Sequence, residues 1–217
     1  MAAKRRRTPV PRDETKQKTR EALIRAALEL FTEQGLDAPS LDAICDRAGF
    51  TRGAFYVHFA DREALLVAVM EHVGEAFLAS VFAGLSAEDH RSARRHGAIR
   101  TVAGRFLRAV EAGAYPLLAA EGGRPTVRMH QLLAACARSP TVRERYKGLV
   151  EASIASIAAL ASDDQDARVV RGDVLRDEIG TLLLAVIIGA QTMRELDVPI
   201  DPTRLTKAML TLLDPPE

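Results

Sequence analysis

Residues 40–66 read SLDAICDRAGFTRGAFYVHFADREALL, and this pattern predicts two short helices separated by a glycine turn. Ser40 has a hydroxyl that can cap a helix over 41–48, where apolar residues recur at helical spacing. Gly49 follows, and glycine adopts the left-handed backbone that ends a helix without steric cost. Thr51 can then cap the second helix. The stretch is therefore predicted to form a helix-turn-helix.

The predicted second helix, 52–59, has a buried side and an exposed side. Phe55 and Phe59 lie one turn apart, so we expect both rings to point inward. The residues left on the outer surface are Arg52, Gly53, Tyr56, Val57 and His58. A guanidinium, a phenol and an imidazole on one short helix suit contacts with phosphates and base edges in the major groove of DNA. The caps and the glycine alone leave another interpretation open, an αα-hairpin in an ordinary helical bundle.

A longer string, AGFTRGAFYVHFADREALL at residues 48–66, resembles the segment from helix 2 to helix 4 of the TetR family of bacterial transcriptional regulators. Members typically show Ala-Gly, then Ser or Thr, Lys or Arg, a small residue, an aromatic-rich Tyr-x-His/Tyr-Phe, a charged cap and Leu-Leu. The match runs residue by residue and extends back through the preceding helix. The resemblance implies an all-α fold, in which an N-terminal three-helix helix-turn-helix DNA-binding domain is joined by helix 4 to a larger helical ligand-binding and dimerisation domain. It also implies a regulator rather than an enzyme.

Carried over by matching position, the resemblance assigns roles within the helix-turn-helix. The residues expected to face bases are Arg52, Gly53, Ala54 and Val57. The residues expected to hold phosphates are Ser40, Thr51, Tyr56, His58 and Arg62. Arg52 is the best candidate for direct readout, because a bidentate contact with guanine is worth about 1–3 kcal/mol. Two roles stay open for the nearby Asp42: it orients Arg52, or it accepts a hydrogen bond from cytosine.

The sequence predicts three segments along the chain. Residues 1–15 form a basic arm with two prolines and no apolar periodicity, so we expect this arm to be disordered. Its basic side chains either reach along DNA or form a solvated tail. Residues 16–62 form the helix-turn-helix domain, and residues 63–217 form the larger domain. The net charge of +1 is no argument against DNA binding, because local rather than total charge decides such binding.

Helical patterns also fill the rest of the chain. Asp61 can cap the fourth helix, whose apolar residues repeat along one face as far as Val81. Later helices are expected at 91–113, 115–121, 126–139, 141–161, 173–196 and 202–213. A polar loop over 162–172 separates the two longest of these. The sequence contains no convincing strand and no internal repeat, so the predicted class is all-α.

Two late helices, 141–161 and 173–196, have surfaces that suit pairing between two copies of the chain. The first carries small side chains that let another helix approach closely. The second carries a wide apolar surface formed by Ile179, Leu182, Leu183, Val186, Ile187 and Ala190. A four-helix interface in a homodimer covers both surfaces and agrees with the dimer that the resemblance implies, while burial within one monomer is the alternative. A two-fold dimer reads a palindromic operator in double-stranded DNA.

The middle helices are the expected place for a small-molecule effector. Candidate lining residues are Phe77, Phe106, Tyr115, Met129, His130, Leu133 and Gln191. This set is mostly apolar, so we expect a mainly apolar ligand, although ordinary core packing is the alternative for each residue. In the predicted mechanism the ligand moves the fourth helix, and a repressor dimer leaves its operator. A ligand-independent regulator or activator is the alternative.

Other classes of function find little support. The chain contains no Gly-rich phosphate loop, GxSxG or HExxH motif, so we predict no catalytic residue and no cofactor. Cys45, Cys136 and the five histidines lack metal-binding spacing, and both cysteines are expected to be buried in a reducing compartment. No apolar run is long enough to span a bilayer, and no secretory signal is present. We therefore expect a cytoplasmic protein.

Overall fold

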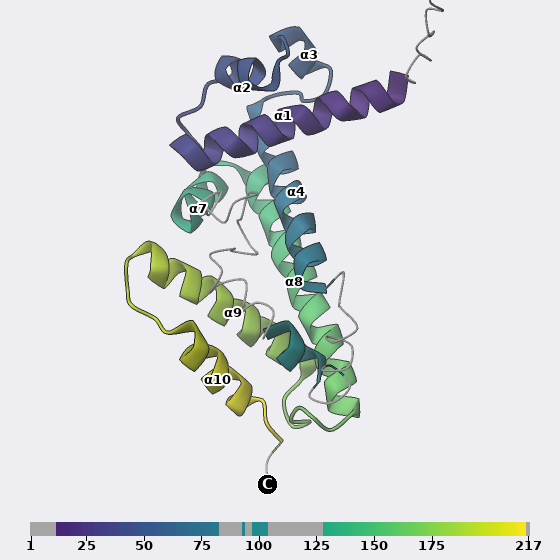
Figure 1. The fold of residues 1–217 in the computed structure, drawn as a ribbon, viewed down its shortest axis with the longest axis vertical. Coiled ribbons are helices and arrows are strands. Elements are labelled where there is room, and N and C mark those ends of the chain that lie inside the picture. The colour runs from purple at the N-terminus through teal and green to yellow at the C-terminus, as the bar shows by residue number, and fades with distance from the viewer. Residues whose placement is uncertain (1–11, 83–92, 94–96, 104–127, 216–217) are drawn as a thin grey trace, which may run out of the picture. The chain divides into compact units, whose positions relative to one another are not determined.

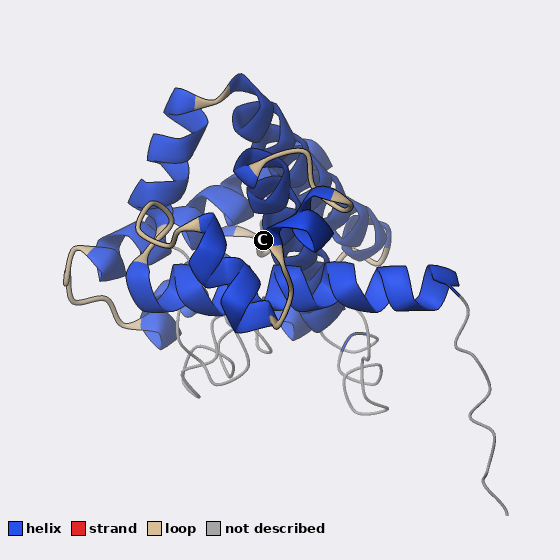
Figure 2. Cartoon of the chain, turned by 90° about the horizontal axis from the view of Figure 1, so that it is seen from above, coloured by secondary structure: helices blue, strands red, loops and turns tan. Residues whose placement is uncertain are grey.

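The computed structural model describes residues 12–82, 93, 97–103 and 128–215, and the regular elements in these ranges are all helices (Figure 1; Figure 2). They are α1 (Arg12–Gln34), α2 (Leu41–Ala48), α3 (Arg52–Tyr56), α4 (Arg62–Phe82), a short helical segment over 98–103, α7 (Met129–Arg138), α8 (Pro140–Asp166), α9 (Arg176–Glu195) and α10 (Pro202–Leu212). The prediction of an all-α fold is confirmed. The helix predicted at 115–121, and most of the one at 91–113, lie outside the described residues.

The chain divides into two compact units, Met1–Val69 and Met70–Glu217. The division falls inside α4, whereas the sequence prediction ended the first domain at residue 62, where this helix begins. The physical reason is that the first turns of α4 bury Leu65 and Val69 as part of the first unit. A domain boundary placed at the start of α4 omits these side chains.

In the first unit, α1, α2, α3 and the start of α4 bury one apolar core. Its largest fully buried side chains are Leu23, Phe31, Ile44, Phe55 and Leu65. They come from all four helices, so each helix is held in place by burial of its apolar face. Arg47 of α2 adds ion pairs to Glu29 and Glu33 of α1, at 3.3 and 3.0 Å. Because these carboxylates are exposed, the buried core contributes far more to stability than the ion pairs do.

α1 begins earlier than the sequence predicts. Residues 1–15 are predicted to be a disordered arm, but the helix starts at Arg12. Asp13 and Glu14 favour this start, because acidic side chains in the first turn lie at the positive end of the helix dipole. Glu14 also forms an ion pair with Lys18 at 2.6 Å, one turn further along. Residues 1–11 lie outside the described part of the chain, so the role of the basic arm stays a prediction.

In the second unit, α8 and α9 pack closely against each other (Figure 1). Gly180 of α9 permits this approach, because a Cβ atom there would lie 2.6 Å from the carbonyl oxygen of Ile154 and 3.3 Å from the amide nitrogen of Ala158. A buried cluster around these helices contains Ile99, Ala161, Val170, Ile179, Leu183 and Leu213. Met209 and Leu210 of α10 pack against the cluster.

Two late helices differ from their predicted bounds. α8 ends at Asp166, so the first part of the predicted loop over 162–172 is helical. α9 begins at Arg176 rather than at residue 173. The polar composition of the loop predicted an exposed segment, but Asp164 within it is buried. A buried carboxylate needs hydrogen-bond donors, and Asp164 finds them in another segment of the chain.

These donors lie at the start of the segment over 98–103. The carboxylate of Asp164 accepts hydrogen bonds from the backbone N–H groups of Ala98, at 2.7 Å, and Ile99, at 2.8 Å. Gly97 has a φ of 91°, and a Cβ atom there would lie 2.7 Å from Oδ2 of Asp164. Glycine at this position thus lets the carboxylate reach the backbone. Asp164 caps the segment from a distant helix, α8.

Candidate functional site

The turn between α2 and α3 is formed as the sequence predicts. Ser40 caps α2, because its Oγ accepts a hydrogen bond from the N–H of Ala43 at 3.1 Å. Gly49 ends α2 with a left-handed φ of 76°. Thr51 then caps α3, because its Oγ1 accepts from the N–H of Ala54 at 3.3 Å. These contacts confirm the predicted local pattern and fix where α3 starts.

α3 has one buried side and one exposed side. Its regular part ends at Tyr56, and a turn carries the chain to Phe59, the predicted last residue of the helix. Phe55 and Phe59 are buried, which confirms the predicted inward direction of both rings. On the other side, Tyr56 is 56% exposed and Val57 is 64% exposed. The side of α3 that carries Tyr56 and Val57 is therefore open to solvent.

The residues predicted to face bases lie on this exposed side. Arg52, Gly53 and Val57 are exposed, and Ala54 is half-buried. The backbone at Gly53 is open, since a Cβ atom there would have Oγ1 of Thr51 as its nearest neighbour, at 3.7 Å. A groove of DNA can therefore approach the α3 backbone closely at its first turn.

Arg52 is held by an ion pair with Asp42 of α2. Nε of Arg52 donates to Oδ1 of Asp42, and Nη2 donates to Oδ2 at 2.8 Å. These hydrogen bonds, together with the charge of the carboxylate, raise the pKa of Arg52. Of the two roles that the sequence leaves open for Asp42, this geometry favours the orientation of Arg52.

Three of the predicted phosphate ligands are exposed hydroxyls. Ser40 and Thr51 use their oxygens as acceptors in the helix caps, which leaves each O–H free to donate to a phosphate. Tyr56 projects from the exposed side of α3. The contacts of these groups with phosphates stay a prediction, and their positions at the solvent side of the two helices are compatible with it.

His58 lies beside Lys16 and Arg20 of α1, a proximity that the sequence did not predict. Burial lowers the pKa of His58, and the charges of Lys16 and Arg20 lower it further. The guanidinium of Arg20 also lies over the ring of Phe59, 5.4 Å from its centroid. A phosphate near His58 would therefore meet the cations of Lys16 and Arg20 beside the imidazole. The sequence feature that could have indicated a shared basic site is the four-residue spacing of Lys16 and Arg20, because this spacing places both side chains on one face of a helix.

Arg62 has partners inside the first unit. Its guanidinium donates to the carbonyl oxygens of Leu36 and Asp37 and lies 5.9 Å from the ring centroid of Phe31. These contacts join the start of α4 to the loop after α1. They use two of the five N–H donors of the guanidinium, so a structural role competes with the predicted phosphate contact.

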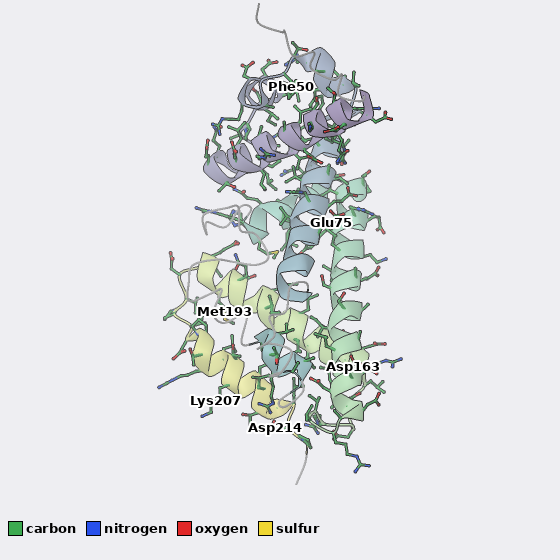
Figure 3. All side chains as sticks on the ribbon, turned by 45° about the vertical axis from the view of Figure 1, so that its right-hand side comes forward. Phe50, Glu75, Asp163, Met193, Lys207 and Asp214 are labelled. Carbon is green, nitrogen blue, oxygen red and sulfur yellow. The ribbon has the colours of Figure 1, made fainter. Side chains whose placement is uncertain are left out.

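In the second unit, α8 and α9 each have an exposed face of small or apolar side chains. On α8 this face consists of Gly148, Ala152, Ala155 and Ala159. On α9 and just beyond it, the face consists of Leu182, Ala185, Thr192, Met193 and Leu196. Figure 3 labels Met193. The α8 residues are spaced three or four apart, and the α9 residues recur with the same helical repeat, so each set lies on one side of its helix.

The apolar residues predicted to form the pairing surface of α9 lie mostly elsewhere. Of the six, Leu182 alone is exposed. Ile179 and Leu183 belong to the buried cluster, and the other three line a cavity. Their prediction as a pairing surface was therefore wrong for five residues, because an apolar pattern does not reveal which neighbour covers it.

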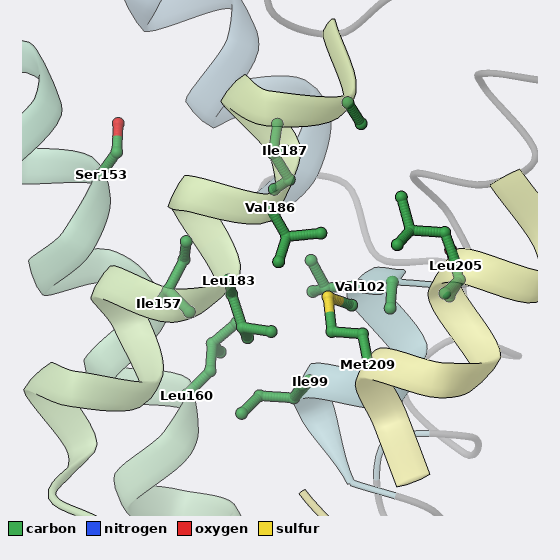
Figure 4. A pocket seen from close by; sticks show the side chains of 13 residues that line it. Ile99, Val102, Ser153, Ile157, Leu160, Leu183, Val186, Ile187, Leu205 and Met209 are labelled. Carbon is green, nitrogen blue, oxygen red and sulfur yellow. The ribbon is translucent and has the colours of Figure 1, made fainter. Parts of the chain in front are cut away.

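The cavity has a volume of about 70 Å³ and lies between the segment 98–103, α8, α9 and α10 (Figure 4). It is lined by Ile99, Val102, Ala103, Ser153, Ile157, Leu160, Leu183, Val186, Ile187, Ala190, Leu205, Thr206 and Met209. Among the described residues that line it, Ser153 and Thr206 are the ones that carry hydroxyl groups. The walls therefore suit an apolar molecule with at most one or two hydrogen-bonding groups.

The predicted ligand residues on α7 do not line this cavity. Met129 is buried at the start of the helix, and its sulfur accepts a hydrogen bond from the hydroxyl of Tyr146 at 3.6 Å. His130 is exposed, and its Nδ1 lies 3.3 Å from Oε2 of Glu195. Leu133 is exposed as well. These side chains face solvent or the packing between α7 and its neighbours.

The remaining predicted ligand residues are placed only in part. Gln191 is buried in α9 and does not line the cavity. Phe77 lies in α4, but its side chain is outside the described part of the chain. Phe106 and Tyr115 lie outside it altogether. A ligand role for this set stays a prediction.

The helix-turn-helix region matches a known family model. The model is described as bacterial regulatory proteins, tetR family, and it matches residues 23–69. The match includes α2, α3 and the turn between them. Over these residues the chain matches the TetR family. This match confirms the resemblance found in the sequence, and the model describes regulatory proteins.

Curated relatives of this region are named HTH-type transcriptional regulators. The HTH-type transcriptional regulator AcrR of Shigella flexneri is 44% identical over 55 residues, which are 25% of this chain and 26% of AcrR. The HTH-type transcriptional regulator TcmR of Streptomyces glaucescens is 35% identical over 88 residues, 41% of this chain and 38% of TcmR. The matches thus span well under half of these relatives.

Solved structures resemble nearly the whole chain. Salmonella enterica GusR has a TM-score of 0.68 at 23% identity, covering 90% of this chain and 95% of its own. A second structure is NalD, described as the secondary repressor of the MexAB-OprM multidrug efflux pump in Pseudomonas aeruginosa. It has a TM-score of 0.60 at 25% identity, and the match covers 93% of this chain and 98% of NalD. The TetR-like fold therefore extends through the second unit.

Three further observations concern the described residues only. Among them, no helix combines the length and apolar character needed to cross a membrane. No group of three or more His, Cys, Asp or Glu side chains within these ranges is arranged to hold a metal ion. Cys45 and Cys136 are buried free thiols, as predicted, and burial raises the pKa of each.

Proposed function

We propose that this protein is a TetR-type regulator, which binds a palindromic operator in double-stranded DNA as a homodimer and represses transcription in the cytoplasm. The observation that carries the proposal is the exposed side of α3. This side carries the exposed side chains of Arg52, Tyr56 and Val57. The opposite side of the helix is held in the core by the buried ring of Phe55. A rigid helix with a guanidinium and a phenol on its free side suits base and phosphate contacts in a major groove.

In this proposal one set of residues around α3 contacts bases and another contacts phosphates. Base edges are contacted by Arg52, Gly53, Ala54 and Val57, and phosphates by Ser40, Thr51, Tyr56, His58 and Arg62. Lys16 and Arg20, which lower the pKa of His58, add positive charge beside the phosphate contacts. Of these residues, Arg62 has the least support as a phosphate ligand, because its guanidinium already donates to backbone carbonyl oxygens.

The exposed faces of α8 and α9 support the homodimer. Small side chains on α8 allow a helix of a second copy to approach, and Leu182 and Met193 on α9 supply apolar surface to bury. A two-fold axis places two recognition helices about 34–36 Å apart, so that they enter successive major grooves. This pairing gives the affinity that one short helix lacks.

The cavity supports release by a small, mainly apolar effector. At about 70 Å³ it is small beside the roughly 300–1,000 Å³ of sites for drug-sized ligands, so a larger effector enters only if a wall moves. One wall is α8, which supplies Ile157 and Leu160. α8 also contacts α4, where Leu149 packs on Gly74 and Arg145 pairs with Glu71. An effector that shifts α8 therefore acts on α4, the helix shared by both units.

Selection of bound fragments from random duplex DNA tests the DNA-binding part of this proposal. We expect a palindrome with a guanine in each half-site. Arg52→Ala should weaken discrimination at that guanine by roughly 5- to 150-fold, the equivalent of one bidentate contact. Tyr56→Phe removes only a hydroxyl and should weaken binding to all sequences alike, by about tenfold.

Arg204→Ala is the matched control, because this arginine is exposed in the second unit. It should leave both affinity and selectivity unchanged. Unaltered discrimination by Arg52→Ala would overturn the assignment of α3 as the reading helix.

A titration tests the effector. Small apolar compounds that bind the wild-type cavity should lower its affinity for the selected duplex, as measured by fluorescence anisotropy of labelled DNA. Ala190→Phe places a ring in the cavity, so it should block compound binding and keep DNA binding. Compounds that bind the wild type but not Ala190→Phe, and yet leave operator affinity unchanged, would contradict the effector mechanism.

A further inference from the structure

The ion pair between Arg52 and Asp42 leaves one edge of the guanidinium free. Arginine carries five N–H donors in one plane. Asp42 occupies the edge formed by Nε and Nη2. The edge that remains is formed by Nη1 and the second hydrogen of Nη2. Its two parallel donors match O6 and N7 of guanine, the acceptors that arginine contacts in the major groove.

Stability does not explain this ion pair. The side chains of Arg52 and Asp42 are 58% and 61% exposed, and exposed pairs of this kind contribute little to the free energy of unfolding. A carboxylate on a surface that meets DNA also repels phosphates and weakens binding to every sequence. The presence of Asp42 is therefore best explained by its effect on Arg52.

We infer that Asp42 is a positioning residue for base readout, which holds the guanidinium of Arg52 toward guanine and away from the phosphates. The inference rests on the proposed function, because it requires Arg52 to contact a base. Without Asp42, Arg52 is free to turn toward a phosphate, and a phosphate contact carries no sequence information. A guanidinium held in place also loses less conformational freedom when DNA binds.

Asp42→Asn tests this inference, because it removes the charge with little change of shape. We expect the variant to bind non-specific duplexes about threefold more tightly and to lose about tenfold of its discrimination for guanine over the other bases. The measurement is the Kd for the selected duplex, and for duplexes with that guanine replaced, at two salt concentrations. In a double variant with Arg52→Ala, Asp42→Asn should cause no further loss of discrimination.

Asp46→Asn is the matched control, because it removes the same charge from an exposed position of α2 that does not contact Arg52. It should bind all duplexes slightly more tightly and keep the guanine preference. If Asp42→Asn behaves like Asp46→Asn, the inference is wrong. It is also wrong if Asp42→Asn changes the preference at another base pair in the Arg52→Ala background, which would assign Asp42 to cytosine. A wild-type chain without any preferred sequence would overturn the proposed function as well, whereas the first two results overturn the inference alone.

Discussion

Ala155→Arg is expected to convert the protein from a dimer into a monomer and to lower its affinity for the selected duplex by about 100- to 1,000-fold. Ala155 lies in the exposed small-residue face of α8, so the arginine meets solvent in the single chain and leaves its fold intact. In a two-fold interface the same change places two guanidinium groups among apolar side chains without partners. Light scattering measures the mass of the protein in solution, and anisotropy of labelled DNA measures the affinity.

Ala208→Arg is the matched control for this experiment. Ala208 is exposed on α10 beside Arg204 and Lys207, so its surroundings are already solvated and basic. This variant should remain dimeric and bind DNA like the wild type. A dimeric Ala155→Arg protein with unchanged affinity would show that the exposed faces of α8 and α9 do not form the interface.

Asp164→Ala is expected to cause the largest loss of stability, roughly 2–6 kcal/mol of the free energy of unfolding. The carboxylate is buried and accepts hydrogen bonds from the backbone N–H groups of Ala98 and Ile99. The alanine variant leaves two backbone donors without their partner, and each buried donor left unsatisfied is destabilising by about 1–3 kcal/mol. Urea unfolding followed by circular dichroism measures this difference.

Two further variants make the test specific. Asp163→Ala removes an exposed carboxylate one residue away, which Figure 3 labels, and should change stability by less than about 0.5 kcal/mol. Asp164→Asn retains an acceptor oxygen and should fall between the two alanine variants. Equal stability of Asp164→Ala and Asp163→Ala would refute the capping role. Because Ile99, Val102 and Ala103 line the cavity, Asp164→Ala should also weaken binding of any cavity ligand.

The helix-turn-helix was predictable because its signals are local. Caps at Ser40 and Thr51, the left-handed Gly49 and the inward direction of Phe55 depend on residues within a turn or two of one another. The exposed side of α3 then follows from helical periodicity. Such features are set before distant parts of the chain are considered, so a single sequence suffices to place them.

Contacts between distant segments were harder to predict. The polar residues around Asp164 indicate a loop, but the carboxylate finds buried donors more than sixty residues earlier in the chain. In the same way, the apolar residues of α9 divide among the core, the cavity and an exposed face. Periodicity shows that a side of a helix is apolar, and only the packed structure shows what covers it. The position of Lys16 and Arg20 beside His58 was not predicted, because α1 and the end of α3 meet only in the folded unit.

Hydroxyl-radical footprinting of the wild-type protein on its selected duplex tests the central claim most directly. Two copies of the α3 surface related by a two-fold axis should protect two symmetric patches on one face of the DNA, with their centres about 10 base pairs apart. A single patch, or protection without two-fold symmetry, would contradict the claim that this protein reads DNA as a dimer through α3.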